Sequence, residues 1–160
     1  MGKKKTIFFQ VIAISLVTFF VYFPSLTNGF IWDDDDYVIN NFSIQKTDGL
    51  KEIWFSYKTP QYYPVVFSSF WLEYKLWGLH PAGYHLINLI FHIFNALLIY
   101  AVLFKLHRSL ALIAPLIFAL HPVQVETDEW ITERKNIFGA FLYLITTFIY
   151  VRFYDSHRKK

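Results

Sequence analysis

An apolar stretch followed closely by a run of four aspartates constrains this chain most strongly. Residues 7–23 are apolar almost throughout, and residues 33–36 are all Asp. Seventeen residues at 1.5 Å rise just cross a hydrocarbon layer of ~30 Å, if the layer thins slightly or the next residues extend the helix. Four like charges cannot lie in lipid, so they belong at the water interface. Carboxylates concentrated there suggest chemistry or ion binding; the alternative is a solvated acidic loop that stops the helix from sliding inward.

The composition indicates a membrane protein. Of the 160 residues 55% are hydrophobic, whereas a soluble domain is closer to ~45–50% apolar. Aromatic residues make up 21%, which suits lipid-facing and interfacial positions. There is no Cys, which excludes disulfides and thiolate metal sites.

Four apolar segments predict an all-α integral membrane fold in a single domain over residues 1–160. The predicted spans are residues 7–23, 84–104, 110–125 and 137–154. The third is interrupted by Pro115 and by His121-Pro122, and a very short turn joins it to the second, so these two should pack as an antiparallel pair. The basic start of the chain resembles a signal peptide, but the first apolar stretch is too long and lacks a small-residue cleavage site, which favours an uncleaved anchor.

The distribution of charge predicts the orientation of the spans. With the N-terminus inside, the inner segments hold nine of the fifteen Lys and Arg residues and only one acid, Asp155. The outer loops, residues 24–83 and 126–136, hold eleven of the twelve acids. Because Lys/Arg bias in short loops sets topology, we expect a multi-pass protein with both termini in the cytoplasm and the aspartates facing the periplasm or a lumen.

The first outer loop is rich in Trp and Tyr interleaved with Lys. This pattern predicts short helices lying in the interface plane, which would form a roof over the bundle. An ordinary belt of interfacial aromatic residues is the alternative.

Polar residues recur along one face of the second span. His85, Asn88, His92 and Asn95 are spaced by 3, 4 and 3 residues, so they must face the bundle or a wet cavity. Hydrogen bonding between helices explains such a stripe without any further function, and we favour that for Asn95. His85, nearest the outer surface, is the expected site residue. No His/Glu spacing here matches a zinc motif.

The second outer segment combines acids with two cations. Glu126, Trp130 and Glu133 recur on one face of a short helix, and Arg134 and Lys135 lie outside, against the topological bias. Cations beside a membrane suit an anionic headgroup or a phosphate, although pairing with Glu in the same helix is the alternative.

Three ordered blocks of residues resemble the TMTC-type membrane glycosyltransferases, whose eukaryotic members are O-mannosyltransferases with TPR repeats. The first block is Phe30-Ile31-Trp32-Asp33-Asp34-Asp35-Asp36-Tyr37-Val38 with Asn40-Asn41. The second is Tyr62-Tyr63-Pro64-Val65 and Leu76-Trp77-Gly78, then His80-Pro81-Ala82-Gly83-Tyr84-His85-Leu86-Ile87-Asn88 and His92 with Asn95-Ala96-Leu97. The third is Phe118-Ala119-Leu120-His121-Pro122-Val123, then Val125-Glu126, Trp130 and Glu133-Arg134-Lys135.

The resemblance implies a GT-C fold, of which this chain would form a partial bundle, with the active site on the outer face. It implies a polyprenyl-phosphate-linked sugar as donor and a hydroxyl as acceptor. An Asp-Asp-x-x-Tyr pattern in the first outer loop would carry catalysis, with Asp33 as the base and Asp34 as its neighbour. His85, Glu126, Arg134 and Lys135 would then bind substrate, and Arg134 or Lys135 would stabilise the departing phosphate.

Carboxylates from both outer loops also form a candidate metal site. Asp33 and Glu126 each open an outer segment directly after an odd-numbered span, so we expect them to border one cavity. With Asp36 they would suit Mg²⁺ or Mn²⁺, which prefer oxygen ligands.

We therefore expect the N-terminal portion of a sugar-transferring membrane enzyme, incomplete alone. The family's TPR domain has no counterpart in these residues; either the chain is a truncated or split gene product, with the remaining spans on another chain in the second case, or it is a fragment. The expected partners are membrane lipid and the lipid-linked sugar, with no nucleic acid. The compartment would be a bacterial inner membrane, or the endoplasmic reticulum in a eukaryote. The alternatives are a non-catalytic interaction module with an acidic docking or cation-binding loop, and, more remotely, a small transporter subunit.

Overall fold

The computed structural model describes residues 2–158, without the side chains of Lys3, Thr127, Asp128 and Arg158. Lys159 and Lys160, which contribute to the orientation prediction, lie outside the described residues. The described residues are helical and contain no strand, as the sequence predicts. The α-helices are α1 (Lys3–Tyr22), α2 (Phe42–Gln45), α3 (Gly49–Phe55), α4 (Pro64–Trp77), α5 (Pro81–Leu106), α6 (Ile113–Leu120), α7 (Val123–Glu129) and α8 (Arg134–Arg158). Shorter turns are η1 (Phe23–Thr27), η2 (Asp35–Ile39) and η3 (Ile131–Glu133).

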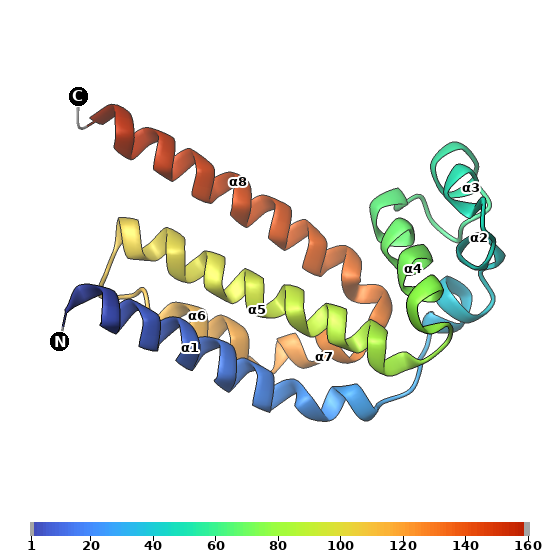
Figure 1. The fold of residues 1–160 in the computed structure, drawn as a ribbon, viewed down its shortest axis with the longest axis horizontal. Helices are drawn as coiled ribbons and strands as arrows, with labels where there is room; N and C mark the ends of the chain where they lie inside the picture. Colours follow the sequence, from blue (N-terminus) through green and yellow to red (C-terminus); the bar gives the residue numbers. More distant parts are fainter. Residues whose placement is uncertain (1, 159–160) are drawn as a thin grey trace.

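Three helices are long and apolar enough to cross a membrane, and they form the body of the molecule. These candidate spans are Lys4–Thr27, Pro81–Leu106 and Ile131–His157. The central helix α5 packs against both α1 and α8. Figure 1 shows that α1 begins and α8 ends at the same end of the bundle. Both α5 and α8 begin at the opposite end, so these two helices run in the same direction.

The predicted span over residues 110–125 is not a continuous helix. Only α6 is regular there, and eight residues rise by about 12 Å, well short of the ~30 Å hydrocarbon layer. The helix ends because Pro122 lacks an N–H and disfavours helical backbone at the preceding residue; His121 is extended, with a ψ of 133°. The described residues therefore contain three continuous helices of spanning length, and the expected count of four is not confirmed.

The segment between α5 and α8 nonetheless runs back along the bundle. In Figure 1, α6 lies beside α5 and leads through α7 towards the end at which α8 begins, and α6 packs against both α5 and α1. The chain makes this return in short helical pieces joined by turns.

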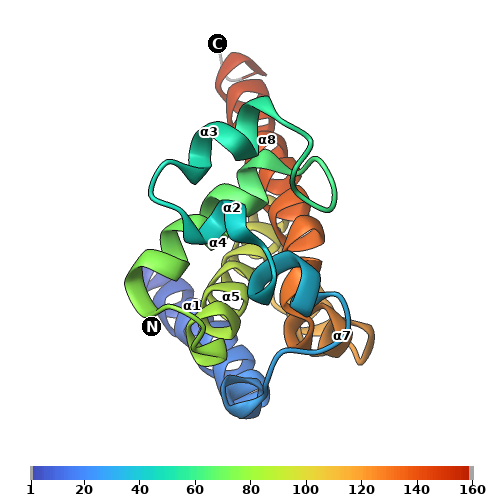
Figure 2. The same cartoon turned by 90° about the vertical axis from the view of Figure 1, so that its right-hand side faces the viewer.

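Helices α2, α3 and α4 form a small subdomain at the end of the bundle where α5 begins, as seen end-on in Figure 2. Aromatic and aliphatic side chains form its core, including Tyr37, Val38, Phe67 and Phe70, and Tyr84 and Ile131 extend that core onto the bundle. α4 contacts both α5 and α8. Residues 24–83 thus contain the expected short helices, with several of their aromatic rings packed inward; their position in the interface plane stays a prediction.

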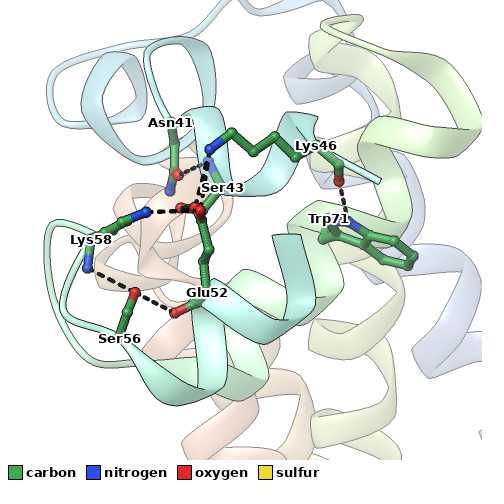
Figure 3. A network of polar contacts seen from close by, with 7 residues as sticks. All are labelled: Asn41, Ser43, Lys46, Glu52, Ser56, Lys58 and Trp71. Carbon is green, nitrogen blue, oxygen red and sulfur yellow. Dashed lines mark hydrogen bonds and ion pairs between the residues drawn. The ribbon is translucent and has the colours of Figure 1, made fainter. Parts of the chain in front are cut away.

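A polar network fastens α2 to α3 and α4 (Figure 3). The carboxylate of Glu52 accepts hydrogen bonds from Lys58 (2.9 Å), Lys46 (3.2 Å) and the Ser43 hydroxyl (3.0 Å). The Trp71 indole donates to the Lys46 carbonyl at 2.7 Å. These donors, Lys58 first, lower the pKa of Glu52 to about 2.

The Glu52 network predicts a specific pH dependence of stability. Because the pKa of Glu52 is lowered on folding, its stabilising contribution is present above the ordinary value of 4.5 and is lost as pH falls towards about 2. The difference in unfolding midpoint between wild type and Glu52→Gln, followed by Trp fluorescence in lipid nanodiscs, should be constant near neutrality and shrink over that range. Lys51→Gln, an exposed change on α3, is the control. A pH-independent difference would contradict the assignment.

Candidate functional site

The side chain of Arg134 lies wholly buried where α4, α5 and α8 meet. Its Nε donates to Asn88 Oδ1 at 2.7 Å, and its Nη2 donates to the Tyr84 carbonyl at 2.7 Å. Nη1 donates to Ser69 Oγ at 3.1 Å and forms an ion pair with Glu73. Every nitrogen of the guanidinium thus has a partner, and these partners lie on α4 and α5.

Burial makes the Glu73–Arg134 pair a strong constraint. Desolvation raises the pKa of Glu73 to about 7, and the adjacent guanidinium opposes that shift. Arg134 stays charged at any ordinary pH, so it needs a counterion wherever it is buried. The Phe70 ring, 4.6 Å from the guanidinium carbon, adds a cation–π contact. The expectation that Arg134 reaches an anionic lipid headgroup does not match this placement, because the side chain has no exposed surface.

One of the four aspartates is turned inward. Asp34 is fully buried, and its carboxylate accepts hydrogen bonds from the Ile31 N–H at 3.1 Å and the Thr132 N–H at 2.9 Å. Burial raises the pKa of Asp34, and these backbone bonds oppose the rise. The carboxylate therefore joins the acidic run to the turn that precedes α8.

The other three aspartates, Asp33, Asp35 and Asp36, are exposed. The preceding residue, Trp32, has a φ of 51°, a left-handed conformation that is uncommon outside glycine. The Trp32 ring packs edge-on against Trp130 at 5.0 Å between centroids. This contact holds the turn that presents Asp33 at the surface next to the buried Asp34.

The polar stripe of α5 is buried and bonded along its length. His85 Nε2 lies 3.4 Å from the Gly29 carbonyl, and Asn88 Nδ2 donates to the Ile131 carbonyl at 3.4 Å. His92 Nε2 is 3.2 Å from the Ala119 carbonyl, and Asn95 Nδ2 donates to the Ile137 carbonyl at 3.1 Å. The predicted inward-facing stripe is confirmed. A substrate-binding role for His85 stays a prediction.

Lys135 is the accessible cation of the Arg134-Lys135 pair. It forms an ion pair with Glu133 at 3.0 Å, and its ammonium lies 5.2 Å from the Trp130 ring. Lys135 also lines a cavity of about 250 Å³ between the start of α4 and the first turns of α8. The other lining residues are mostly apolar: Tyr62, Tyr63, Pro64, Val65, Val66, Phe138, Gly139 and Leu142.

Glu126 is exposed on α7, one turn before Trp130. The contact between the Trp32 and Trp130 rings brings the segment that carries Asp33 close to the segment that carries Glu126. In the part of the chain that the structure describes, no group of three or more His, Asp or Glu side chains is arranged to hold a metal. Metal binding by Asp33, Asp36 and Glu126 stays a prediction.

Sequence reasoning missed Glu73, Ser69 and Asn88 as partners of Arg134. One signal was present: Glu73 is the single acid in the aromatic-rich segment that forms α4. An isolated carboxylate in such a segment needs a cation as its partner, and Arg134 at the start of a span is one candidate.

The architecture defines a helical protein of membrane type with a polar site at one end of its bundle. Comparison with known proteins identifies relatives. Over 94% of this chain, it is 29% identical to a protein O-mannosyl-transferase of Caenorhabditis elegans, covering 24% of that protein. It is 30% identical to human protein O-mannosyl-transferase TMTC3 over 82% of this chain and 16% of the relative. It is 25% identical to human protein O-mannosyl-transferase TMTC4 over 96% of this chain and 24% of the relative.

The homologues that cover most of this chain are TMTC-family protein O-mannosyltransferases, and the chain corresponds to one part of them. The resemblance expected from the sequence blocks is confirmed. The chain spans about a sixth to a quarter of the length of these curated relatives. No family model matches the chain, and no solved structure is significantly similar to it.

The Arg134 contacts predict that Arg134→Met is severely destabilising. Removing the guanidinium leaves Glu73 buried and unpaired, which typically costs about 3–5 kcal/mol. Chemical unfolding in detergent micelles measures the loss. The double variant Arg134→Met/Glu73→Met should recover much of it, because no buried charge remains.

Arg108→Met is the matched control, because Arg108 is exposed in the turn after α5 and should tolerate the change. Equal effects of Arg134→Met and Arg108→Met would refute the anchoring role of Arg134.

Proposed function

We propose that this chain forms part of the active site of a membrane glycosyltransferase. The enzyme would transfer a hexosyl group, mannosyl by analogy with the relatives' names, from a polyprenyl-phosphate donor to a hydroxyl acceptor on the outer face. The observation that carries the proposal is the pairing of an exposed Asp33 with a buried, hydrogen-bonded Asp34 in an Asp-Asp-x-x-Tyr sequence.

In this proposal Asp33 is the general base. The acceptor hydroxyl gives its proton to the Asp33 carboxylate while its oxygen bonds to the anomeric carbon of the sugar. The bond from that carbon to the phosphate oxygen breaks, and the polyprenyl phosphate leaves with the bonding electrons. Asp34 acts as a positioning residue, because its two backbone hydrogen bonds hold the turn that carries Asp33.

Lys135 would bind the phosphate of the donor. It borders a largely apolar cavity beside α8, where an isoprenoid chain would lie against Phe138 and Leu142 with the phosphate near the ammonium. Lys135 suits this role better than Arg134, because Lys135 is partly exposed and Arg134 is enclosed by its partners. A phosphate there would compete with Glu133 for the ammonium.

The proposed orientation places both termini in the cytoplasm and the chain across the membrane four times. The third crossing would be the segment 110–125, which returns along α5 in pieces; a broken helix is tolerated at membrane depth where protein covers it. The contacts of α6 with α1 and α5 support that path.

Because the chain lacks Cys, single-cysteine labelling tests this topology. Ser109→Cys should react with a membrane-impermeant maleimide only from the cytoplasmic side, and Glu126→Cys only from the opposite side. Both positions are exposed, so burial does not limit either reaction. Labelling of both cysteines from one side would exclude a crossing between them.

Asp33→Asn should reduce sugar transfer at least ~10²-fold, because the amide keeps the size and polarity of the side chain but cannot accept the proton. The assay supplies a polyprenyl-phosphate mannose and a peptide acceptor to this chain joined to, or co-expressed with, the remaining spans of a relative. Membrane insertion and unfolding midpoint should stay unchanged.

Asp35→Asn is the matched control for Asp33→Asn, because Asp35 is equally an exposed carboxylate of the same run. Asp35→Asn should reduce the rate of sugar transfer much less than Asp33→Asn does. Unchanged transfer in both variants would favour a non-catalytic acidic loop, and equal large losses would favour a collective cation site.

A further inference from the structure

A second cavity, of about 200 Å³, lies among α5, α6, α7 and α8. Its polar lining consists of His92, Asn95, Gln124 and Asn136, and its apolar lining includes Phe118 and Ala140. None of the described side chains that line it is charged. The cavity with Lys135 shares none of these residues, so the two are separate.

One polar atom at this cavity lacks a partner among the described residues. Asn95 is almost completely buried, and its Nδ2 donates to the Ile137 carbonyl at 3.1 Å. Its Oδ1 is also buried and accepts no hydrogen bond in the part of the chain that the structure describes. A buried acceptor is costly to leave unpaired, so this site calls for a hydrogen-bond donor.

The surrounding groups define the kind of donor. His92 Nε2 faces the Ala119 carbonyl, which only accepts, so Nε2 carries the proton and Nδ1 of the neutral ring is an acceptor. The side-chain amides of Gln124 and Asn136 offer both donors and acceptors. The Phe118 ring, stacked on His92 at 5.4 Å, adds an apolar surface. Several hydroxyl groups on a ring with apolar C–H edges would match this set, whereas a charged ligand would find no counterion among the described lining residues.

We propose that this cavity binds an uncharged monosaccharide ring. Its volume of about 200 Å³ is far more than the ~10–15 Å³ that one water molecule requires, so it has room for a ring. The break at His121-Pro122 has a role in this arrangement, because it starts α7 afresh and places Gln124 at the cavity. Broken helices line polar binding sites in other membrane proteins for the same reason. The inference deepens the proposed function and rests on it, since sugar transfer would supply such a ring.

The test measures binding of methyl α-mannoside to the 160-residue chain in lipid nanodiscs, by saturation-transfer NMR. A small neutral ligand in such a site should show saturable binding with a Kd on the order of 1 mM. Ala140→Leu places an apolar side chain in the cavity without removing a hydrogen bond, and should weaken binding at least tenfold. Asn95→Leu removes the unpaired acceptor and should also weaken binding at least tenfold.

Thr146→Leu is the control, because it also introduces a Leu on α8, but at an exposed position away from the cavity, and should leave the Kd unchanged. Glycerol, which carries hydroxyls but no ring, should not compete; competition by glycerol would overturn the ring assignment. No saturable binding to wild type would mean that the cavity holds water only, and unchanged binding to Ala140→Leu would place the sugar elsewhere. Either result overturns the proposal.

The measurement uses no lipid donor and no acceptor, so its outcome is separate from that of the transfer assay. Asp33→Asn should bind the sugar as wild type does, because Asp33 does not line this cavity. Loss of transfer with retained binding would thus support both proposals. Binding by wild type without any transfer activity would leave the sugar site standing and count against the proposed function.

Discussion

The guanidinium of Arg134 is a permanent charge without exposed surface, and the arrangement of three helices satisfies it. Its donors reach α4 through Ser69 and Glu73, and α5 through Asn88 and the Tyr84 carbonyl. Any displacement of these helices would leave a buried charge or a buried acceptor unpaired, which costs more than most apolar rearrangements. The junction between the small subdomain and the bundle is therefore defined by polar geometry, and the aromatic core around Phe67 and Phe70 packs around it.

Because a buried charge needs partners, neighbouring residues of the same charge take up different environments in the structure. Arg134 and Lys135 are adjacent cations, but successive residues of a helix point about 100° apart, so enclosing the first directs the second to the surface. Among the aspartates, Asp34 is enclosed by backbone N–H groups, while Asp33 stays exposed. A site that needs one fixed and one available group of the same charge obtains both from neighbouring residues. The fixed member supplies the position, and the available member can meet a substrate.

The long helices were predictable because they depend on local properties. Apolar length defines α1, α5 and α8, and the 3, 4, 3 spacing from His85 to Asn95 predicts the buried face of α5. A continuous helix over the third span was not confirmed, because the apolar average of residues 110–125 conceals the effect of Pro122 on backbone conformation. The pairing of Glu73 with Arg134 joins residues 61 positions apart. No local pattern encodes such a contact, so the burial of Arg134 was not predicted from the sequence.

The two cavities differ in the chemistry that they offer, and the difference follows from the helices that line them. Lys135 gives the cavity beside α4 one cation in apolar surroundings, which suits an anionic group attached to a long apolar chain. The cavity beside α6 and α7 has amides and an imidazole without charge, which suits hydroxyl groups. Both are lined by the first two turns of α8, one through Lys135 and Phe138 and the other through Asn136 and Ala140. The start of α8, fixed by Arg134, therefore presents two different chemistries on its two faces.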